Sequence, residues 1–179
     1  NLENKPLFIF AAVFDERKGV FTTIEAFNKV LKSLSSVHLV MIGIGKLWDR
    51  AQEIVEGLGI KNHVTFIKWM PNDELASVFT AADVLVHPSE PYRDWEEQYG
   101  WTMLQASSSG LPVIATDIGS INETILDEKT GILIEPKNPD ALAQAMIYLA
   151  QHPEIRKQMG AEGREHILNR FSHQSVARR

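Results

Sequence analysis

One stretch of this chain combines carboxylates and aromatic rings in a way that suits binding of a sugar or a nucleotide. It lies just before a predicted helix and reads Asp94-Trp95-Glu96-Glu97-Gln98-Tyr99-Gly100. Carboxylates accept hydrogen bonds from hydroxyl groups, and aromatic faces stack on sugar rings and bases. A solvated cluster that caps the following helix would use the same residue types. The stretch alone leaves both interpretations open.

Two earlier loops carry residues that suit a phosphate group. Gly43-Ile44-Gly45-Lys46 leads from an apolar run directly into a predicted helix, where glycines allow close backbone approach and the helix start favours an anion. Its spacing matches neither the dinucleotide-binding nor the P-loop signature, so a plain tight turn is the alternative. Lys18, beside Gly19, could reach a phosphate as a point charge, and a solvated loop is the alternative there.

A later loop, Asp117-Ile118-Gly119-Ser120, offers backbone amides, and Glu123 follows it in the first turn of a predicted helix. The six histidines are scattered, and His87, at the end of an apolar run, is expected to be structural. The sequence shows no group of side chains with metal-ligand spacing. We therefore predict no metal site and no required divalent cation or other cofactor.

These loops follow six short apolar runs that alternate with helical patterns along the chain. The runs cover residues 7–12, 38–42, 64–67, 83–86, 112–115 and 131–134. Helical spacing is found at 20–34, 48–58, after Pro71 with Asn72 or Asp73 as the cap, at about 100–108, at 142–149, and in two short segments from Pro153 onward. Continuous apolar runs are typical of strands buried on both faces. The pattern predicts an α/β fold, a doubly wound, Rossmann-like parallel sheet of about six strands flanked by helices.

Length and composition exclude several classes of protein. The 179 residues suit one domain, here residues 1–179, and no apolar window is long enough to cross a membrane. The chain has no cysteine and a net charge of -5, with 18 Lys and Arg against 23 Asp and Glu. An acidic balance argues against a nucleic-acid partner. The lack of cysteine fits a reducing compartment, so a cytoplasmic protein is expected.

Taken in order, the loops resemble the nucleotide-sugar-binding C-terminal domain of glycosyltransferase family 4, the retaining group 1 glycosyl transferases with the two-domain GT-B architecture. The resemblance runs from about Pro6 to Phe171. Its most specific segments are Glu97-Gln98-Tyr99-Gly100, Gln105-Ala106, Gly110-Leu111-Pro112-Val113-Ile114-Ala115 and Thr130-Gly131-Ile132-Leu133. Lys18-Gly19, Gly43-Ile44-Gly45, and the run from Ala82 to Ser89 match what precedes them.

The resemblance implies a role for each loop. Lys18 would hold the donor diphosphate and Glu97 the hydroxyls of the transferred sugar, and these two are the expected catalytic residues. The remaining donor-binding residues would contact the base, the ribose and the phosphates: Gly43, Gly45, Trp69, Met70, Tyr99, Gly100, Trp101, Thr102 and Gln105. The substrate would be a UDP- or GDP-linked sugar, with the leaving diphosphate taking the proton of the acceptor hydroxyl.

Two positions depart from the family pattern. Gln105 stands where the family has a second glutamate, and Val13 where it usually has an arginine beside the diphosphate. Losing one charge-assisted contact costs about 1.5–3 kcal/mol, which Arg17 or Lys46 would partly restore. A degenerate, non-catalytic module that binds protein or glycan is therefore the alternative function.

The resemblance also implies a partner domain. A GT-B enzyme needs an N-terminal acceptor domain of similar size, which this chain does not contain, so the isolated domain is expected to bind donor and to transfer little sugar. Through such a parent protein it would associate peripherally with the inner face of a membrane. The sequence does not identify the sugar, the base or the acceptor.

Overall fold

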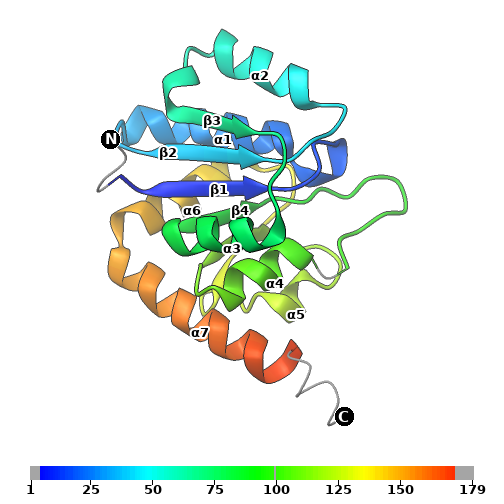
Figure 1. Cartoon of the computed structure of the whole chain (residues 1–179), viewed down its shortest axis with the longest axis vertical. Coiled ribbons are helices and arrows are strands. Elements are labelled where there is room, and N and C mark those ends of the chain that lie inside the picture. Colours follow the sequence, from blue (N-terminus) through cyan, green and yellow to red (C-terminus); the bar gives the residue numbers. More distant parts are fainter. Residues whose placement is uncertain (1–4, 99, 172–179) are drawn as a thin grey trace.

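The sheet predicted from the apolar runs is present in the computed structural model, which describes residues 5–98 and 100–171. In this part of the chain, six strands form one parallel sheet in the order β3-β2-β1-β4-β5-β6 (Figure 1). The strands are Leu7–Ala11 (β1), His38–Ile42 (β2), Val64–Ile67 (β3), Val84–His87 (β4), Val113–Thr116 (β5) and Gly131–Ile134 (β6). This strand order confirms the doubly wound, Rossmann-like prediction.

Helices cover both faces of the sheet. They are Val20–Ser33 (α1), Trp48–Gly57 (α2), Asn72–Ala81 (α3), Trp101–Ser108 (α4), Ile121–Thr124 (α5), Pro139–Gln151 (α6) and Pro153–Phe171 (α7). The layer of α1, α2 and α6 packs on one face, and α3, α4 and α5 pack on the other. α7 starts beside α6 and runs along α4 (Figure 1). Single 3-10 turns at Glu16–Lys18 and Lys61–His63 precede α1 and β3.

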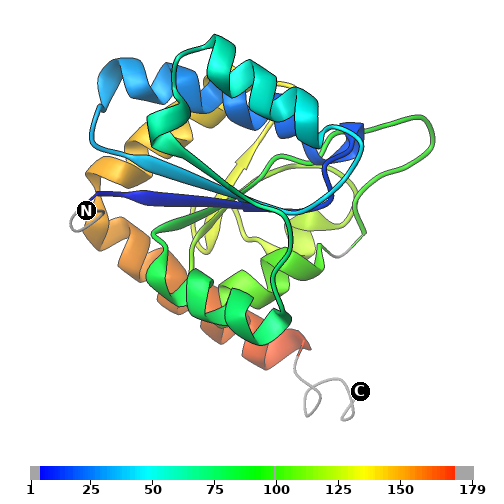
Figure 2. The same ribbon diagram turned by 45° about the horizontal axis from the view of Figure 1, so that its top comes forward.

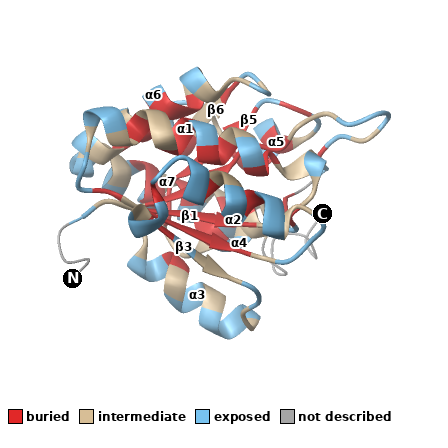
Figure 3. Ribbon diagram, turned by 90° about the horizontal axis from the view of Figure 1, so that it is seen from above, coloured by how far each residue is buried: buried red, intermediate tan, exposed pale blue. Residues whose placement is uncertain are grey.

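The strands are apolar throughout because each face of the sheet meets a helical layer. In β1, Phe8 and Phe10 pack into the cluster under α1 and α6, whereas Ile9 and Ala11 pack into the cluster under α3 and α4. Such alternation with both faces buried is what parallel sheets require. Figure 3 shows the resulting buried sheet between two layers whose outer surfaces are exposed.

The C-terminal region differs from the prediction of two short helices. Residues 153–171 form one helix, α7, despite two glycines in its interior. Glycine weakens a helix by about 1 kcal/mol relative to alanine. Here a side chain at Gly160 would bring its Cβ to 1.9 Å from the carbonyl oxygen of Gly110. Close packing of α7 on the neighbouring turn therefore explains the glycine and outweighs its poor helix propensity.

The topology gathers the loops that follow the strands at one edge of the sheet. All strands run in the same direction, and the segment after β4 projects from that edge as a long loop (Figure 2). The strand order reverses between β1 and β4, which are neighbours in the middle of the sheet. Ligands of such sheets bind beyond the carboxyl ends of the strands at this reversal. Across the described residues, none of the helices combines the length and apolar content needed to span a membrane.

Candidate functional site

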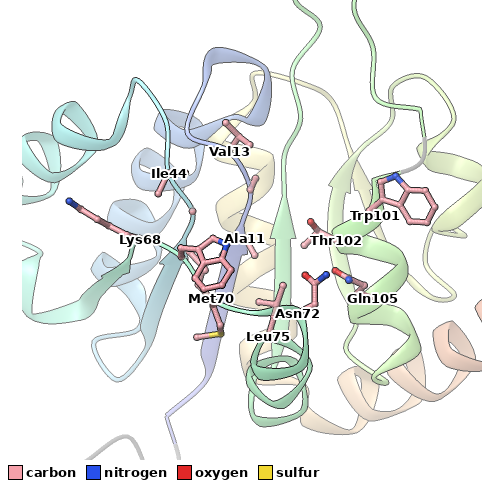
Figure 4. A pocket seen from close by; sticks show the side chains of 14 residues that line it. Ala11, Val13, Ile44, Lys68, Met70, Asn72, Leu75, Trp101, Thr102 and Gln105 are labelled. Atoms are coloured by element: carbon pink, nitrogen blue, oxygen red, sulfur yellow. The ribbon is translucent and has the colours of Figure 1, made fainter.

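A cavity of about 490 Å³ lies beyond the carboxyl ends of β1, β2 and β3 (Figure 4). Three strand ends and the first turns of α3 and α4 supply its walls. They are lined by Ala11, Ala12, Val13, Ile42, Gly43, Ile44, Lys68, Trp69, Met70, Asn72, Leu75, Trp101, Thr102 and Gln105. We call this space the strand-end cavity. Its walls are mostly apolar, with a few polar groups, which is the usual make-up of a small-molecule site.

Most of the predicted donor-binding residues meet in this cavity. Gly43, Trp69, Met70, Trp101, Thr102 and Gln105 all line it. The two tryptophans are unusually open to solvent: Trp69 is 70% exposed and Trp101 is 76% exposed. Figure 4 shows Trp101 at the start of α4, at the far side of the cavity from Lys68. An exposed tryptophan at a cavity rim offers an aromatic face that has no partner within the chain's own core.

Three other predicted residues are placed differently. Gly45 lies outside the lining of the cavity. Gly100 is the residue that precedes α4 and has a positive φ of 54°, so it starts the helix and offers no side chain to cap it. Tyr99 lies outside the described residues. Their predicted roles toward a donor stay predictions.

The glycines of the loop after β2 have a structural reason that the sequence did not reveal. A Cβ on Gly43 would lie 1.9 Å from the carbonyl oxygen of Ala12, and one on Gly45 would lie 2.4 Å from that of Phe14. The loop therefore packs directly against the backbone that follows β1. The prediction that it enters a helix directly is wrong, because α2 begins only at Trp48.

Two side-chain amides lie at the floor of the cavity. Figure 4 shows the amides of Asn72, at the start of α3, and Gln105, on α4, facing one another. Asn72 was predicted as a candidate helix cap, but Pro71 occupies that position and no side chain caps α3. The amide of Asn72 is thus directed to the cavity instead. Amides both donate and accept hydrogen bonds, so this pair suits hydroxyl groups or a base edge.

A second group of polar residues lies past β1 and β4, next to the point where the strand order reverses. Glu97 is buried, and its Oε2 accepts hydrogen bonds from Ser89 Oγ at 2.8 Å and from Lys18 Nζ. The Nε2 atom of His87 lies 3.3 Å from the same oxygen. We call Lys18, His87, Ser89 and Glu97 the carboxylate cluster. It unites the two predicted catalytic residues, which are 79 positions apart in the chain.

The surroundings of Glu97 keep it ionised. Burial by itself raises the pKa of this carboxyl group, but hydrogen bonds from the side chains of His87 and Lys18, with the positive charge of Lys18, outweigh it. The pKa falls to about 2. Lys18 and Glu97 therefore form an ion pair whose side chains are only 16% and 10% exposed. Such a pair presents a positive and a negative group side by side at the edge of the sheet.

Two close backbone contacts hold the carboxylate cluster together. Gly19 has a φ of 64°, and a Cβ there would lie 2.0 Å from the carbonyl oxygen of Pro88. Gly119 has a φ of 56°, and its Cβ would lie 2.1 Å from the carbonyl oxygen of Glu97. Ser120 N also donates to that oxygen at 3.2 Å. The loop after β5, predicted as a source of free amides, thus supports the backbone of Glu97.

The structure also shows the position where the resemblance placed a missing arginine. Val13 lines the strand-end cavity and is half exposed. The two cations expected to compensate are engaged elsewhere: Arg17 Nη2 lies 2.6 Å from Asp15 Oδ2, and Lys46 Nζ lies 2.6 Å from Glu16 Oε2. Lys18 is therefore the cation that the fold directs to the carboxylate cluster.

Sequence reasoning missed several members of this site. His87 was expected to be structural, yet its ring nitrogen faces Glu97. The detectable signal was its position at the carboxyl end of a central strand, directly before Pro88 and Ser89. Asn72 and Leu75 in the strand-end cavity gave no such signal. Within residues 5–98 and 100–171, no three His, Asp or Glu side chains converge as a metal site would need.

Comparisons with known proteins agree on one family. The sequence model of the glycosyl transferases group 1 matches residues 1–166. The GDP-mannose-dependent alpha-(1-6)-phosphatidylinositol monomannoside mannosyltransferase of Mycobacterium tuberculosis is 28% identical over 178 residues, covering 98% of this chain and 46% of that protein. The chain spans about half the length of the curated relatives it matches.

Solved structures share the fold over the whole length of the chain. Sucrose-phosphate synthase from Thermosynechococcus elongatus superposes with a TM-score of 0.86 at 27% identity, covering 99% of this chain and 44% of that one. Anabaena Alr3699/HepE, solved in complex with UDP and glucose, gives a TM-score of 0.87 at 18% identity, covering 99% and 48%. Together with the match to the family's sequence model, the architecture of the sheet leads to one conclusion: the chain belongs to the glycosyl transferases group 1.

Proposed function

We propose that this chain is the donor-binding half of a retaining glycosyltransferase of family 4, which transfers a sugar from a nucleoside diphosphate sugar to an acceptor hydroxyl. The observation that carries the proposal is the side-by-side placement of two sites at one sheet edge. The strand-end cavity offers an apolar, amide-bearing space for a nucleoside. The carboxylate cluster offers a cation and a carboxylate for a diphosphate and a sugar.

Each group has a part in this proposal. The base lies between the loop that carries Trp69 and Met70 and the first turn of α4, and Gln105 contacts the ribose hydroxyls. Asn72, facing Gln105, is available to either. The diphosphate lies by Lys18 and the N-terminus of α4, where the helix dipole favours an anion. Glu97, held ionised by its neighbours, accepts hydrogen bonds from the sugar.

The chemistry needs no nucleophile from this chain. The bond from the anomeric carbon to the diphosphate oxygen breaks, and the acceptor oxygen forms its bond on the same face of the sugar. The departing diphosphate takes the acceptor's proton. Lys18 stabilises the charge that develops on the leaving oxygens, and Glu97 holds the sugar in position. We propose no divalent cation for this step, and adding a chelator to the assays below tests that part.

The parent protein completes the enzyme in this proposal. Its relatives are about twice as long, which supports a second domain that binds the acceptor. We place the parent in the cytoplasm, peripherally bound at the inner face of a membrane. The lack of cysteine fits a reducing compartment.

Calorimetric titration of the domain with UDP, GDP and ADP, and with their sugar conjugates, tests the proposal. GDP is included because the mycobacterial relative is named for GDP-mannose, and UDP because Alr3699/HepE was solved with it. We expect saturable binding of one nucleotide and its loss in Lys18→Ala. Lys46→Ala is the matched control, because Lys46 is exposed and paired with Glu16 away from the cavity.

The alternative function, a degenerate module that binds protein or glycan, rests on Val13 and Gln105. It predicts no saturable nucleotide binding by this domain at millimolar concentration, and none by the full-length parent. Binding by the parent alone would instead show that the second domain completes the donor site.

A further inference from the structure

The loop between β4 and Glu97 is an ordered hairpin that docks on the start of α1. Tyr92 and Trp95 pair across it, with N–H to carbonyl distances of 3.0 and 3.2 Å. At its base, the backbone N–H of Glu90 donates to the carbonyl of Arg17 at 2.8 Å, and the hydroxyl of Thr22 donates to the Glu90 carboxylate. The hairpin is therefore tied to the turn that carries Lys18.

The indole of Trp95 lies against both cations of that turn. Lys18 Nζ is 4.7 Å and Arg17 Cζ is 4.8 Å from the centre of the ring. Arg17 also pairs with Asp15, so its charge is already balanced. Lys18 instead continues from the ring to the carboxylate of Glu97. Trp95 thus touches the cation that the proposed function places at the diphosphate.

Lysine needs such a support more than most side chains do. Its ammonium is a point charge on a flexible four-carbon stem, and ordering it costs up to about 2 kcal/mol of rotamer entropy. A cation over the face of tryptophan is attracted to the ring, and the attraction is stronger where water is displaced. Because the Lys18 side chain is only 16% exposed, the ring holds the ammonium in one place with little competition from solvent.

We propose that Trp95 is a positioning residue, which holds the Lys18 ammonium beside Glu97 so that the cation is already in place when a nucleoside diphosphate arrives. The role in ligand binding rests on the proposed function, whereas the ordering of Lys18 does not. Trp95 acts through Lys18 and makes no contact with the donor itself.

Trp95→Leu tests the proposal, since leucine keeps an apolar side chain but has no aromatic face. The first measurement is the rate of reductive methylation of each lysine, followed by mass spectrometry. We expect Lys18 to react about two- to fivefold faster in Trp95→Leu than in the wild type. Lys46 serves as the internal reference, because its partner is Glu16 and not the hairpin's indole.

The second measurement is the affinity for whichever of UDP or GDP the wild-type domain binds. Trp95→Leu should weaken binding about two- to fivefold, and Trp95→Phe, which restores an aromatic face, should recover most of it. Tyr92→Leu is the matched control, because Tyr92 lies on the same hairpin but contacts Arg93 rather than Lys18. It should leave both the affinity and the Lys18 reaction rate unchanged.

The outcomes separate the two proposals. An unchanged Lys18 reaction rate in Trp95→Leu overturns the positioning role. An equal loss of affinity in Trp95→Leu, Trp95→Phe and Tyr92→Leu overturns it too, because the hairpin as a whole would then be responsible. Faster Lys18 labelling with no nucleotide binding, even by the wild type, supports the positioning role and contradicts the proposed function.

Discussion

The two halves of the candidate site are built on different principles. The strand-end cavity is neutral and open, with two tryptophans exposed at 70% and 76% and with facing amides from α3 and α4. The carboxylate cluster is charged and closed, and its polar groups bind one another. An open apolar surface waits for a ligand to cover it. A buried ion pair must instead be held together by the protein, because either charge alone would be costly.

This difference predicts where substitutions act. Residues of the cavity should affect ligand binding with little effect on folding, because their side chains have few partners inside the chain. Residues of the carboxylate cluster should affect both, because each is a partner of another. Four changes test this contrast, in order of decreasing effect.

The largest effect is expected for Lys18→Met, which leaves the buried carboxylate of Glu97 without its cation. Breaking a buried ion pair from one side costs about 3–5 kcal/mol, and urea unfolding measures the loss. The double variant Lys18→Met/Glu97→Gln should regain about half of it, because no buried charge is then left unpaired. A double variant as unstable as Lys18→Met would show that the pair is not the source of the loss.

Gly43→Ala probes the packing that shapes the cavity. The new methyl group would lie 1.9 Å from the carbonyl oxygen of Ala12, at a residue whose φ is 147°. We expect a loss of about 2–3 kcal/mol in the free energy of unfolding. Gly57→Ala is the matched control, since nothing lies within 4 Å of its added Cβ; it should change stability by no more than about 1 kcal/mol, in the stabilising direction.

The acid limb of the stability curve should depend on Glu97, with a smaller effect than the two changes above. Its pKa is about 2 in the folded chain against 4.5 ordinarily, so the unfolded chain binds a proton more readily. The stability that Glu97 contributes is complete above pH 4.5 and is lost as the pH falls toward 2. Glu97→Gln should flatten this limb in urea titrations from pH 7 to pH 2. An unaltered limb would assign the acid sensitivity to other carboxylates.

The smallest effect belongs to the cavity. Gln105→Glu replaces an amide by a carboxylate, and a charge-assisted hydrogen bond to a ribose hydroxyl is about twice as strong as a neutral one. Nucleotide affinity should rise about three- to tenfold with stability unchanged within about 0.5 kcal/mol. Gln105→Ala should lower the affinity. If Gln105→Glu alters folding stability instead, the contrast between the two halves fails.

The fold followed from the sequence because its signals are local. The strands at 38–42, 64–67 and 131–134 coincide with apolar runs, since residues buried on both faces must all be apolar. The site followed only in part. Lys18 and Glu97 were predicted separately by resemblance, but their ion pair depends on two loops meeting in space. His87 gave only a positional signal, and Asn72 was assigned to the wrong role because capping and ligand binding use the same amide.

The bond between Lys18 and Glu97 also has a consequence for how the chain folds. The two residues are 79 positions apart and follow strands on either side of the sheet's reversal point. Closing a loop of this length carries an entropic cost, so contacts of this kind form after the local ones. The strands β1, β2 and β3 and their helices can assemble without it. Completion of the ion pair therefore marks the docking of the second half of the sheet onto the first, and quenching of Trp95 fluorescence by Lys18 and Arg17 would report that late step.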